Sequence, residues 1–266
     1  MASWLDKLYA ILKRDLLTAM RYRTGFTLAF AGTLAELAAF FYLSRAVGPS
    51  FRPEGHEYFP FLLVGTGFYT FLVVGVNAFL TTVEEAQRHG TLEVLMTSAT
   101  APTTLLLLSA ISAFAASTLN LLLYLAAGFV IFGAGFQANV SATLIVFCLS
   151  LLLAVSIGVF AAALQVATQR GSAVIWLLSS GLWFLTGTMF PVSSLPKQLR
   201  YLSEAVPITH ALRGMRMAVL EHASLGTLAQ EVGWLTLFCV VLLPSSLWVF
   251  ALTLRRARVQ GTLSFY

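Results

Sequence analysis

Charged side chains are scarce in this sequence. Asp, Glu, Lys and Arg together make up 10% of its 266 residues, against about 25% in ordinary soluble domains. Hydrophobic residues make up 58%, and the mean hydropathy is +0.84. This composition excludes a soluble globular domain. Because the apolar runs are long enough for helices that cross a bilayer, we expect an all-α integral membrane protein.

Cysteine and histidine are also few. Cys148 and Cys239 lie in apolar runs with no Cys or His at metal-ligand spacing, so neither a disulfide framework nor a zinc site is supported. The four histidines fall in predicted loops or interfacial segments, and no two are spaced to share a metal. They are His56, His89, His210 and His222. We expect no metal site and no catalytic activity in the chain alone, since no nucleophile lies beside a base within the membrane.

Lysine is the rarest basic residue, and it is absent where a nucleotide site needs it. A phosphate-binding loop requires Lys followed by Ser or Thr, whereas Lys7, Lys13 and Lys197 precede Leu, Arg and Gln. We expect no cofactor in this chain, so ATP and magnesium would bind to a separate subunit. The net charge is +5, but no basic run is long enough to follow a phosphate backbone, so nucleic acid is not an expected partner.

Six spans are predicted from stretches with few or no charges. The uncharged stretch 94–169 is too long for one helix, so we divide it into two helices joined by the turn Gly133–Asn139. Glu36 alone interrupts the first span. A secondary transporter would show more ionisable groups at mid-membrane and a matching repeat. The predicted spans are 25–45, 58–83, 103–132, 140–166, 172–190 and 230–254.

The first 23 residues differ from the spans. Leucines recur at helical spacing among basic residues, which predicts an amphipathic helix over 1–23 on the cytoplasmic membrane surface, in contact with lipid headgroups. A signal peptide is disfavoured because the charged lead is too long. With both termini cytoplasmic, ten Lys and Arg residues lie inside and six outside, which agrees with the positive-inside rule. We expect a multi-pass protein of the cell membrane.

The segment 190–226 is patterned as two short amphipathic helices. Pro191, Pro196 and Pro207 interrupt it too often for a full span, so we predict a re-entrant hairpin at the outer surface between spans five and six. Thr209 is the expected N-cap of the second helix. We expect this hairpin to close the external end of a pathway.

The cytoplasmic segment 84–101 joins spans two and three. It has three carboxylates against one Arg, which is unusual on an otherwise basic inner face and suits a basic partner protein. Gly90 separates the polar end of one helix from a short helix that follows. The residues expected to dock a partner are Glu84, Glu85, Arg88, Gly90, Thr91, Leu92 and Glu93.

In this loop the sequence resembles the membrane permeases of the ABC type-2 exporter family, which carry a Glu followed by Gly-Thr-Leu-Glu. Here these are Glu85 and then Gly90–Glu93. A second similarity lies before the final span, at Phe190-Pro191, Leu195-Pro196, Pro207-Ile-Thr-His-Ala and Arg213. The resemblance implies an exporter in which two permease copies pair and each docks one of two ATPase subunits through a coupling helix after Gly90. It also implies an amphipathic or lipid-linked cargo, such as a glycolipid, a lipid-linked polysaccharide or a drug.

Several residues are candidates for the pathway or its gate, and each has a structural alternative. Glu36 is either a pore group or a carboxyl that joins helices. The aromatic cluster with Phe68 and Tyr69 either lines a pathway or packs helices together. Arg213 and Arg216 either bind a phosphate or lipid headgroup or form a solvated face. Asn120 and Gln165 are expected to join helices, and Gly65–Gly67 to allow close packing. The candidates are Glu36, Phe68, Tyr69, Phe190, Pro191 and Arg213.

The sequence also allows two alternatives to a homodimeric exporter. The chain either pairs with a different permease, or it is a membrane scaffold or receptor-like component that transports nothing itself. Association with an ATPase subunit would favour either form of exporter over the scaffold.

Overall fold

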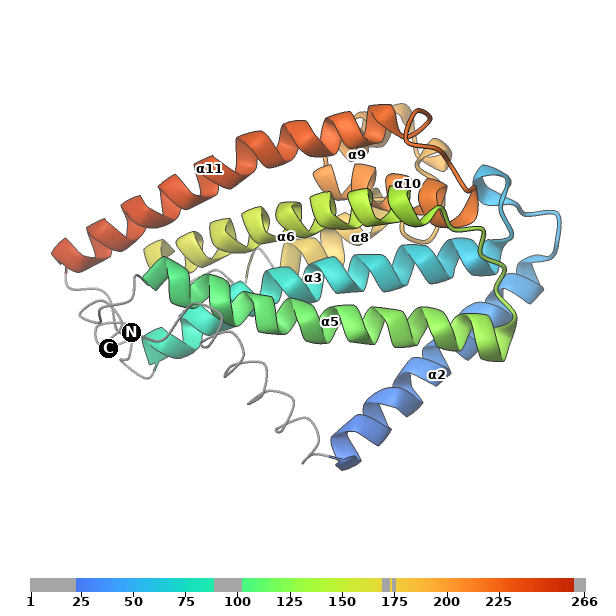
Figure 1. Ribbon diagram of the computed structural model, residues 1–266, viewed down its shortest axis with the longest axis horizontal. Coiled ribbons are helices and arrows are strands. Elements are labelled where there is room, and N and C mark those ends of the chain that lie inside the picture. The colour runs from blue at the N-terminus through green and yellow to red at the C-terminus, as the bar shows by residue number, and fades with distance from the viewer. Residues whose placement is uncertain (1–22, 89–101, 169–172, 174–175, 261–266) are drawn as a thin grey trace.

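The described part of the chain consists of helices joined by loops, with no strand (Figure 1). The computed structural model describes residues 23–88, 102–168, 173 and 176–260. The predicted interfacial helix 1–23 lies almost wholly outside these residues, as do Gly90, Thr91, Leu92 and Glu93 of the predicted docking loop. The long helices are α2 (Arg23–Val47), α3 (Tyr58–Arg88), α5 (Pro102–Phe132), α6 (Val140–Thr168) and α11 (Ala229–Gln260).

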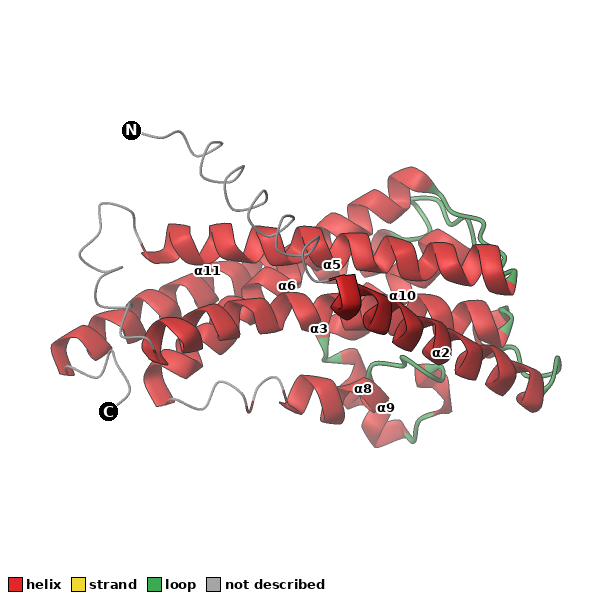
Figure 2. Ribbon diagram, turned by 90° about the horizontal axis from the view of Figure 1, so that it is seen from below, coloured by secondary structure: helices red, strands yellow, loops and turns green. Residues whose placement is uncertain are grey.

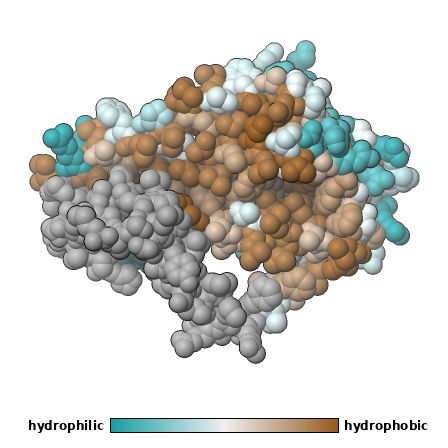
Figure 3. All heavy atoms as spheres, viewed as in Figure 1, coloured by the Kyte–Doolittle hydropathy of each residue, from teal (hydrophilic) through white to brown (hydrophobic). Residues whose placement is uncertain are grey.

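Each of these five helices contains a stretch long and apolar enough to cross a membrane. A 31-residue helix such as α3 is about 46 Å long at 1.5 Å per residue, whereas a bilayer core is about 30 Å thick. Helix α3 therefore has length to spare beyond the hydrocarbon region. Figure 3 shows apolar side chains over the middle of the visible face, and hydrophilic ones gathered towards its two ends.

The core lies between α3, α6, α11 and a shorter helix, α10 (Pro207–Leu220). Helix α11 runs along α6, and α3 packs against both α5 and α6. The window of α3 that would cross the membrane is 83% buried within the protein. This central position explains why an apolar run on α3 shows no polar face.

Helix α2 is attached to the bundle at one end only. Leu37 is fully buried, and Phe41 contacts the rings of Phe59 and Phe132 at centroid distances of 5.4 and 5.3 Å. Towards Arg23, α2 diverges from α3 and α5 (Figure 1). Only 6% of its apolar window is buried, so most of α2 is free to contact lipid or another protein.

The segment predicted as a fifth span is irregular where the structure describes it. A π-helical turn, η2 (Leu177–Gly181), leads into α8 (Leu182–Leu185), and Gly187 then takes a positive φ of 75°. The predicted helix to residue 190 is therefore wrong at its C-terminal end. Glycine suits this position because other residues rarely adopt a positive φ.

Two short helices follow, as the proline spacing predicted. They are α9 (Lys197–Glu204) and α10, and they form what we call the outer hairpin, residues 192–220, after the side of the membrane that the sequence predicts for it (Figure 2). The prediction that Thr209 caps α10 is wrong. Val206 is the N-cap, and Pro207 occupies the first turn, where its missing N–H leaves no hydrogen bond unmade.

Helix α10 is buried among α3, α6 and α11 rather than lying on the surface. The backbone N–H groups of Gln137 and Asn139, in the α5–α6 connection, donate to the carbonyl oxygens of Val219 and Ala218 at 3.0 and 2.9 Å. We call this end of the bundle the hairpin end. The side chain of Gln165 donates to Gln87 on α3 at 3.1 Å, which confirms the prediction that Gln165 joins helices.

Candidate functional site

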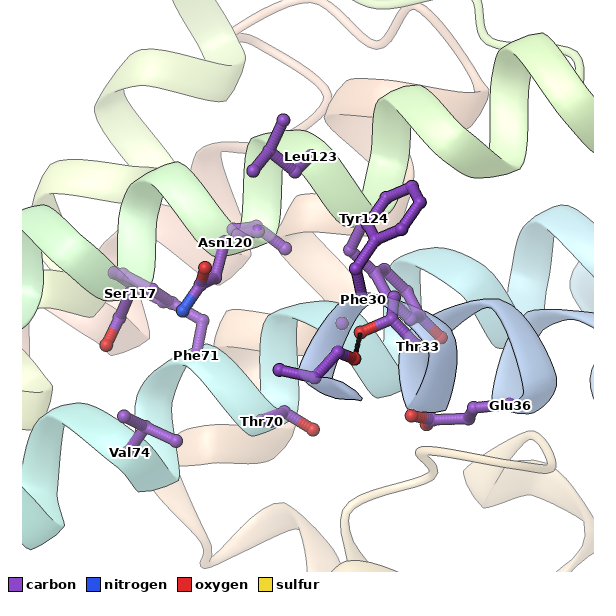
Figure 4. Close-up of a pocket in the computed structure, with 13 residues that line it drawn as sticks. Phe30, Thr33, Glu36, Thr70, Phe71, Val74, Ser117, Asn120, Leu123 and Tyr124 are labelled. Carbon is purple, nitrogen blue, oxygen red and sulfur yellow. Dashed lines mark hydrogen bonds between the residues drawn. The ribbon is translucent and has the colours of Figure 1, made fainter. Parts of the chain in front are cut away.

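A cavity of about 260 Å³ lies between α2, α3 and α5, where α2 diverges. Figure 4 shows side chains from all three helices arranged around it. Its lining combines aromatic rings with hydroxyl, amide and carboxylate groups. The lining residues are Ala29, Phe30, Thr33, Glu36, Gly67, Thr70, Phe71, Val74, Ser117, Asn120, Leu121, Leu123 and Tyr124.

Of the described residues that line the cavity, Glu36 is the only carboxylate, and none is Lys, Arg or His. It lies near the middle of the candidate span Thr27–Val47. The glutamate is exposed within the chain, and it interacts electrostatically with Tyr124. A carboxylate at this depth needs a partner or water, so Glu36 gives the cavity a polar site within an otherwise apolar span.

The Gly65-Thr66-Gly67 triplet of α3 shapes the cavity wall. A Cβ atom added at Gly67 would lie 2.7 Å from the ring of Tyr124, so glycine allows that ring to pack against α3. Thr66 and Tyr124 share a 2.9 Å hydrogen bond between their hydroxyl groups. The prediction that this triplet serves close packing is confirmed.

The other aromatic candidates on α3 lie elsewhere. Phe68 and Tyr69 are 1% and 3% exposed, and neither lines the cavity that holds Glu36. Phe68 faces a second cavity of about 230 Å³, which is wholly apolar and opens between α5, α6 and α10. Its ring stacks on Phe71 at 5.8 Å. The structure thus gives Phe68 a packing role within the core cluster.

At the hairpin end, His210 is buried in a network of charged groups. Its Nδ1 lies 2.6 Å from Oε2 of Glu231 on α11, and its Nε2 donates to the carbonyl oxygen of Glu204 at 2.9 Å. Burial lowers the pKa of His210, but the hydrogen bonds to Glu231 and Glu204 raise it by more, so the pKa lies above its ordinary value. Because both ring nitrogens face acceptors, the geometry fits an imidazolium.

Arg213 belongs to the same network. Its Nη2 donates to Oε1 of Glu204 at 2.6 Å, and its Nη1 donates to Oε1 of Glu231 at 3.1 Å. These carboxylates hold the pKa of Arg213 above its ordinary value despite partial burial. Arg213 is neither a free headgroup site nor part of a solvated face. It ties α9 and α10 to the first turn of α11.

Arg216 differs most from its sequence-based interpretation. It is 3% exposed, which contradicts a solvated face. Its two terminal nitrogens donate to the carbonyl oxygens of Gly187 and Thr188 at 2.8 and 2.7 Å, and its Cζ lies 3.5 Å from the ring centroid of Phe61. The guanidinium therefore satisfies carbonyl groups just after α8 and joins that segment to α3 and α10.

Phe190 and Pro191 lie in the turn between α8 and the outer hairpin. Pro191 is buried, and Phe190 is half-buried with its ring 6.3 Å from that of Phe184. Ser203 on α9 donates to the carbonyl oxygen of Leu185, the last residue of α8, at 2.5 Å. This hydrogen bond holds the turn against the hairpin, and Phe190 and Pro191 lie within the turn.

Three of the predicted docking residues are described, and all lie in the last two turns of α3. Arg88 donates to Glu84 within the helix at 2.6 Å, while Glu85 is exposed. They lie at the end of α3 opposite to the hairpin end (Figure 1). Pairing with Arg88 neutralises much of the charge on Glu84, so Glu85 is the more available carboxylate at this end of α3.

The comparisons define the class of protein. The sequence profile described as "ABC-2 family transporter protein" matches residues 49–248, which is about three quarters of the chain. The chain belongs to this family of membrane transport components. No curated protein sequence matches it.

The sequence does not reveal the burial of His210 and Arg216. It also does not reveal the cavity beside Asn120, for which it predicts only a role in joining helices. Gly65 is a sequence signal for the buried position of Arg216. A Cβ atom at Gly65 would lie 2.6 Å from the carbonyl oxygen of Thr188 and still closer to the guanidinium of Arg216. A glycine in a long apolar helix indicates that another group approaches closely there. Within the described residues, no group of three or more His, Cys, Asp or Glu is placed to hold a metal.

Proposed function

We propose that this chain is the transmembrane subunit of an ATP-driven exporter. It works as a homodimer that binds two copies of a separate ATPase subunit, and it moves an amphipathic or lipid-linked compound outward. The observation that carries this proposal is the polar cavity at Glu36, in a chain of the ABC-2 family. A carboxylate at mid-membrane marks a pathway more often than a packing site.

The topology we propose has six spans, of which the fifth ends with α8, and both termini in the cytoplasm. Residues 1–23 then lie on the cytoplasmic surface. The end of α3 at Arg88 faces the cytoplasm, and the hairpin end faces outward. The outer hairpin re-enters the membrane. Burial of α10 among three spans supports re-entry, because irregular backbone at that depth requires protein around it.

A reconstitution experiment tests the function. The chain and its ATPase, placed in vesicles, are expected to move an amphiphile across the bilayer only with hydrolysable ATP. The chain alone is expected to hydrolyse none, since no Lys in it is followed by Ser or Thr. Hydrolysis by the purified chain, or transport without the ATPase, contradicts the proposal.

Docking is tested by charge reversal at the end of α3 and in the predicted docking loop that follows it in the sequence. Glu85→Lys and Glu93→Lys are expected to weaken association with the ATPase by about tenfold, because they repel a basic groove. Glu57→Lys is the matched control, since Glu57 is exposed at the hairpin end. Unchanged association in both test variants removes the docking role from this loop.

A non-transporting scaffold is the second candidate. It predicts that the chain binds its partners while Glu36→Gln leaves every function of the complex unchanged. A permease that pairs with a different permease is distinguished by mass measurement of the purified complex.

A further inference from the structure

The charge that Glu36 gives to its cavity is negative. None of the uncharged stretches that form α3, α5 and α6 at this depth offers a basic side chain, and the basic residues of α2, Arg23 and Arg45, lie near its ends. Arg45 is about 13 Å from Glu36 along the helix, and its guanidinium lies over Phe41 instead. Among the described residues, Glu36 has no basic partner, so a cationic ligand would supply a counter-ion that these residues do not.

The remaining lining suits a positively charged head. Rings of Phe30, Phe71 and Tyr124 line the cavity, and aromatic faces attract cations within about 6 Å of the ring centroid. Hydroxyl and amide groups of Thr70, Ser117 and Asn120 add hydrogen-bond acceptors. A phosphate or carboxylate would find like charge at Glu36.

The cavity also opens toward the region that lipid would occupy. Phe30, Val74 and Leu123 on its rim are 42%, 46% and 40% exposed. Its volume of about 260 Å³ falls below the roughly 300–1,000 Å³ of pockets that enclose a drug-sized ligand. It therefore has room for a head group, while an apolar tail stays beside the exposed face of α2.

We propose that this cavity binds the cationic head of an amphiphile, such as a hydrophobic amine or a quaternary ammonium compound, against the carboxylate of Glu36. This inference rests on the proposed function and narrows its cargo to cationic amphiphiles. Anionic lipid-linked glycans are then excluded as ligands of this cavity.

The test measures binding to the purified chain in lipid nanodiscs, so it needs no ATPase. The probes are decyltrimethylammonium and decyl sulfonate, which share a tail and differ in the sign of the head. The wild type is expected to bind the cation about tenfold more tightly than the anion. Glu36→Gln is expected to remove this preference, and Glu36→Asp to restore part of it.

Glu57→Gln is the control, because Glu57 lies at the hairpin end and does not line the cavity. Its preference for the cation is expected to equal that of the wild type. A thermal unfolding curve for each variant shows whether it is folded, and the charge-conserving Glu36→Asp keeps the test valid if Glu36→Gln is unstable. Equal binding of the two probes by the wild type, or an unchanged preference in Glu36→Gln, overturns the inference.

Different results would contradict the exporter function and the cationic cargo. Selective binding of the cation without ATP-driven transport leaves the site in place and contradicts the exporter. Transport of an anionic or neutral lipid, with no selective binding of the cation, supports the exporter and contradicts the cationic cargo.

Discussion

The imidazole of His210 and the carboxylate of Glu231 are 2.6 Å apart, and this contact joins α10 to the first turn of α11. The ring of His210 also lies 5.6 Å from that of Trp234, nearly parallel to it. His210 is 2% exposed. The outer hairpin and the last span are thus connected through a buried charged pair, whose strength depends on the protonation of His210.

We predict that the protein loses stability as the pH rises through the pKa of His210. That pKa is raised in the folded state, so the stabilisation is fully present below about pH 6.5, the ordinary value. It disappears as the pH passes the higher folded-state pKa. The Tm of the wild type is expected to fall over this range, and that of His210→Gln to be lower and to change less.

His222→Gln is the matched control for this measurement, since His222 is exposed. Its Tm is expected to change with pH in the same way as that of the wild type. If His210→Gln shows the same pH profile as the wild type, the imidazolium does not stabilise the hairpin.

Arg216→Gln is predicted to destabilise the protein strongly. The change leaves the buried carbonyl groups of Gly187 and Thr188 without their donors, and hydrogen bonds to a charged group contribute about 1.5–3 kcal/mol each. Arg216→Lys is expected to be nearly as unstable, because an ammonium cannot reproduce the planar fork. Thermal unfolding in detergent measures the effect.

Arg52 is exposed, so Arg52→Gln is the control for Arg216→Gln. Arg52→Gln is expected to alter the Tm little. A wild-type Tm for Arg216→Gln contradicts the assigned contact.

The long helices were predictable because the bilayer sets a simple rule. A run of about 20 apolar residues must form a helix there, so charges at Arg45 and Glu84 were enough to mark the ends of spans. The end of the fifth segment was not predictable in this way. Gly187 ends α8 in a positive-φ turn, and a buried arginine 29 positions later satisfies its carbonyl group.

The candidate site was only partly readable from the sequence. Glu36 stood out because it interrupts an apolar run. The cavity around it arises from the angle at which α2 leaves the bundle, and Phe41, Phe59 and Phe132 set that angle through contacts between three helices. No local pattern encodes contacts between side chains so far apart in the chain.

Gly67→Ala is predicted to damage the cavity wall. The new Cβ would lie 2.7 Å from the ring of Tyr124, so the ring must move and its hydrogen bond to Thr66 is strained. Overpacking of this kind costs about 1–3 kcal/mol. Gly233→Ala on α11 is the control, since no heavy atom lies within 4 Å of its added Cβ. Equal Tm values for the two variants contradict the packing assigned to Tyr124.

Thiol labelling of the outer hairpin tests its packing and the topology together. The sequence predicts an outer position for the whole segment 190–226, which includes Ser194 and Ser203. In the structure, Ser203 is fully buried and donates to the carbonyl oxygen of Leu185, whereas Ser194 is exposed. With the native cysteines, Cys148 and Cys239, replaced by serine, we expect Ser194→Cys to react quickly with an impermeant reagent added outside.

Ser203→Cys is expected to react far more slowly, because the reagent reaches it only when α9 separates from the end of α8. In the complete transporter, we expect ATP to accelerate the reaction at Ser203→Cys if export opens the hairpin, and to leave Ser194→Cys unchanged. Labelling of Ser194→Cys only from the cytoplasmic side would invert the proposed topology and remove the docking role from the end of α3. Equal rates at the two positions without ATP would instead mean that α9 does not pack on α8, and the hairpin could not then act as a closure.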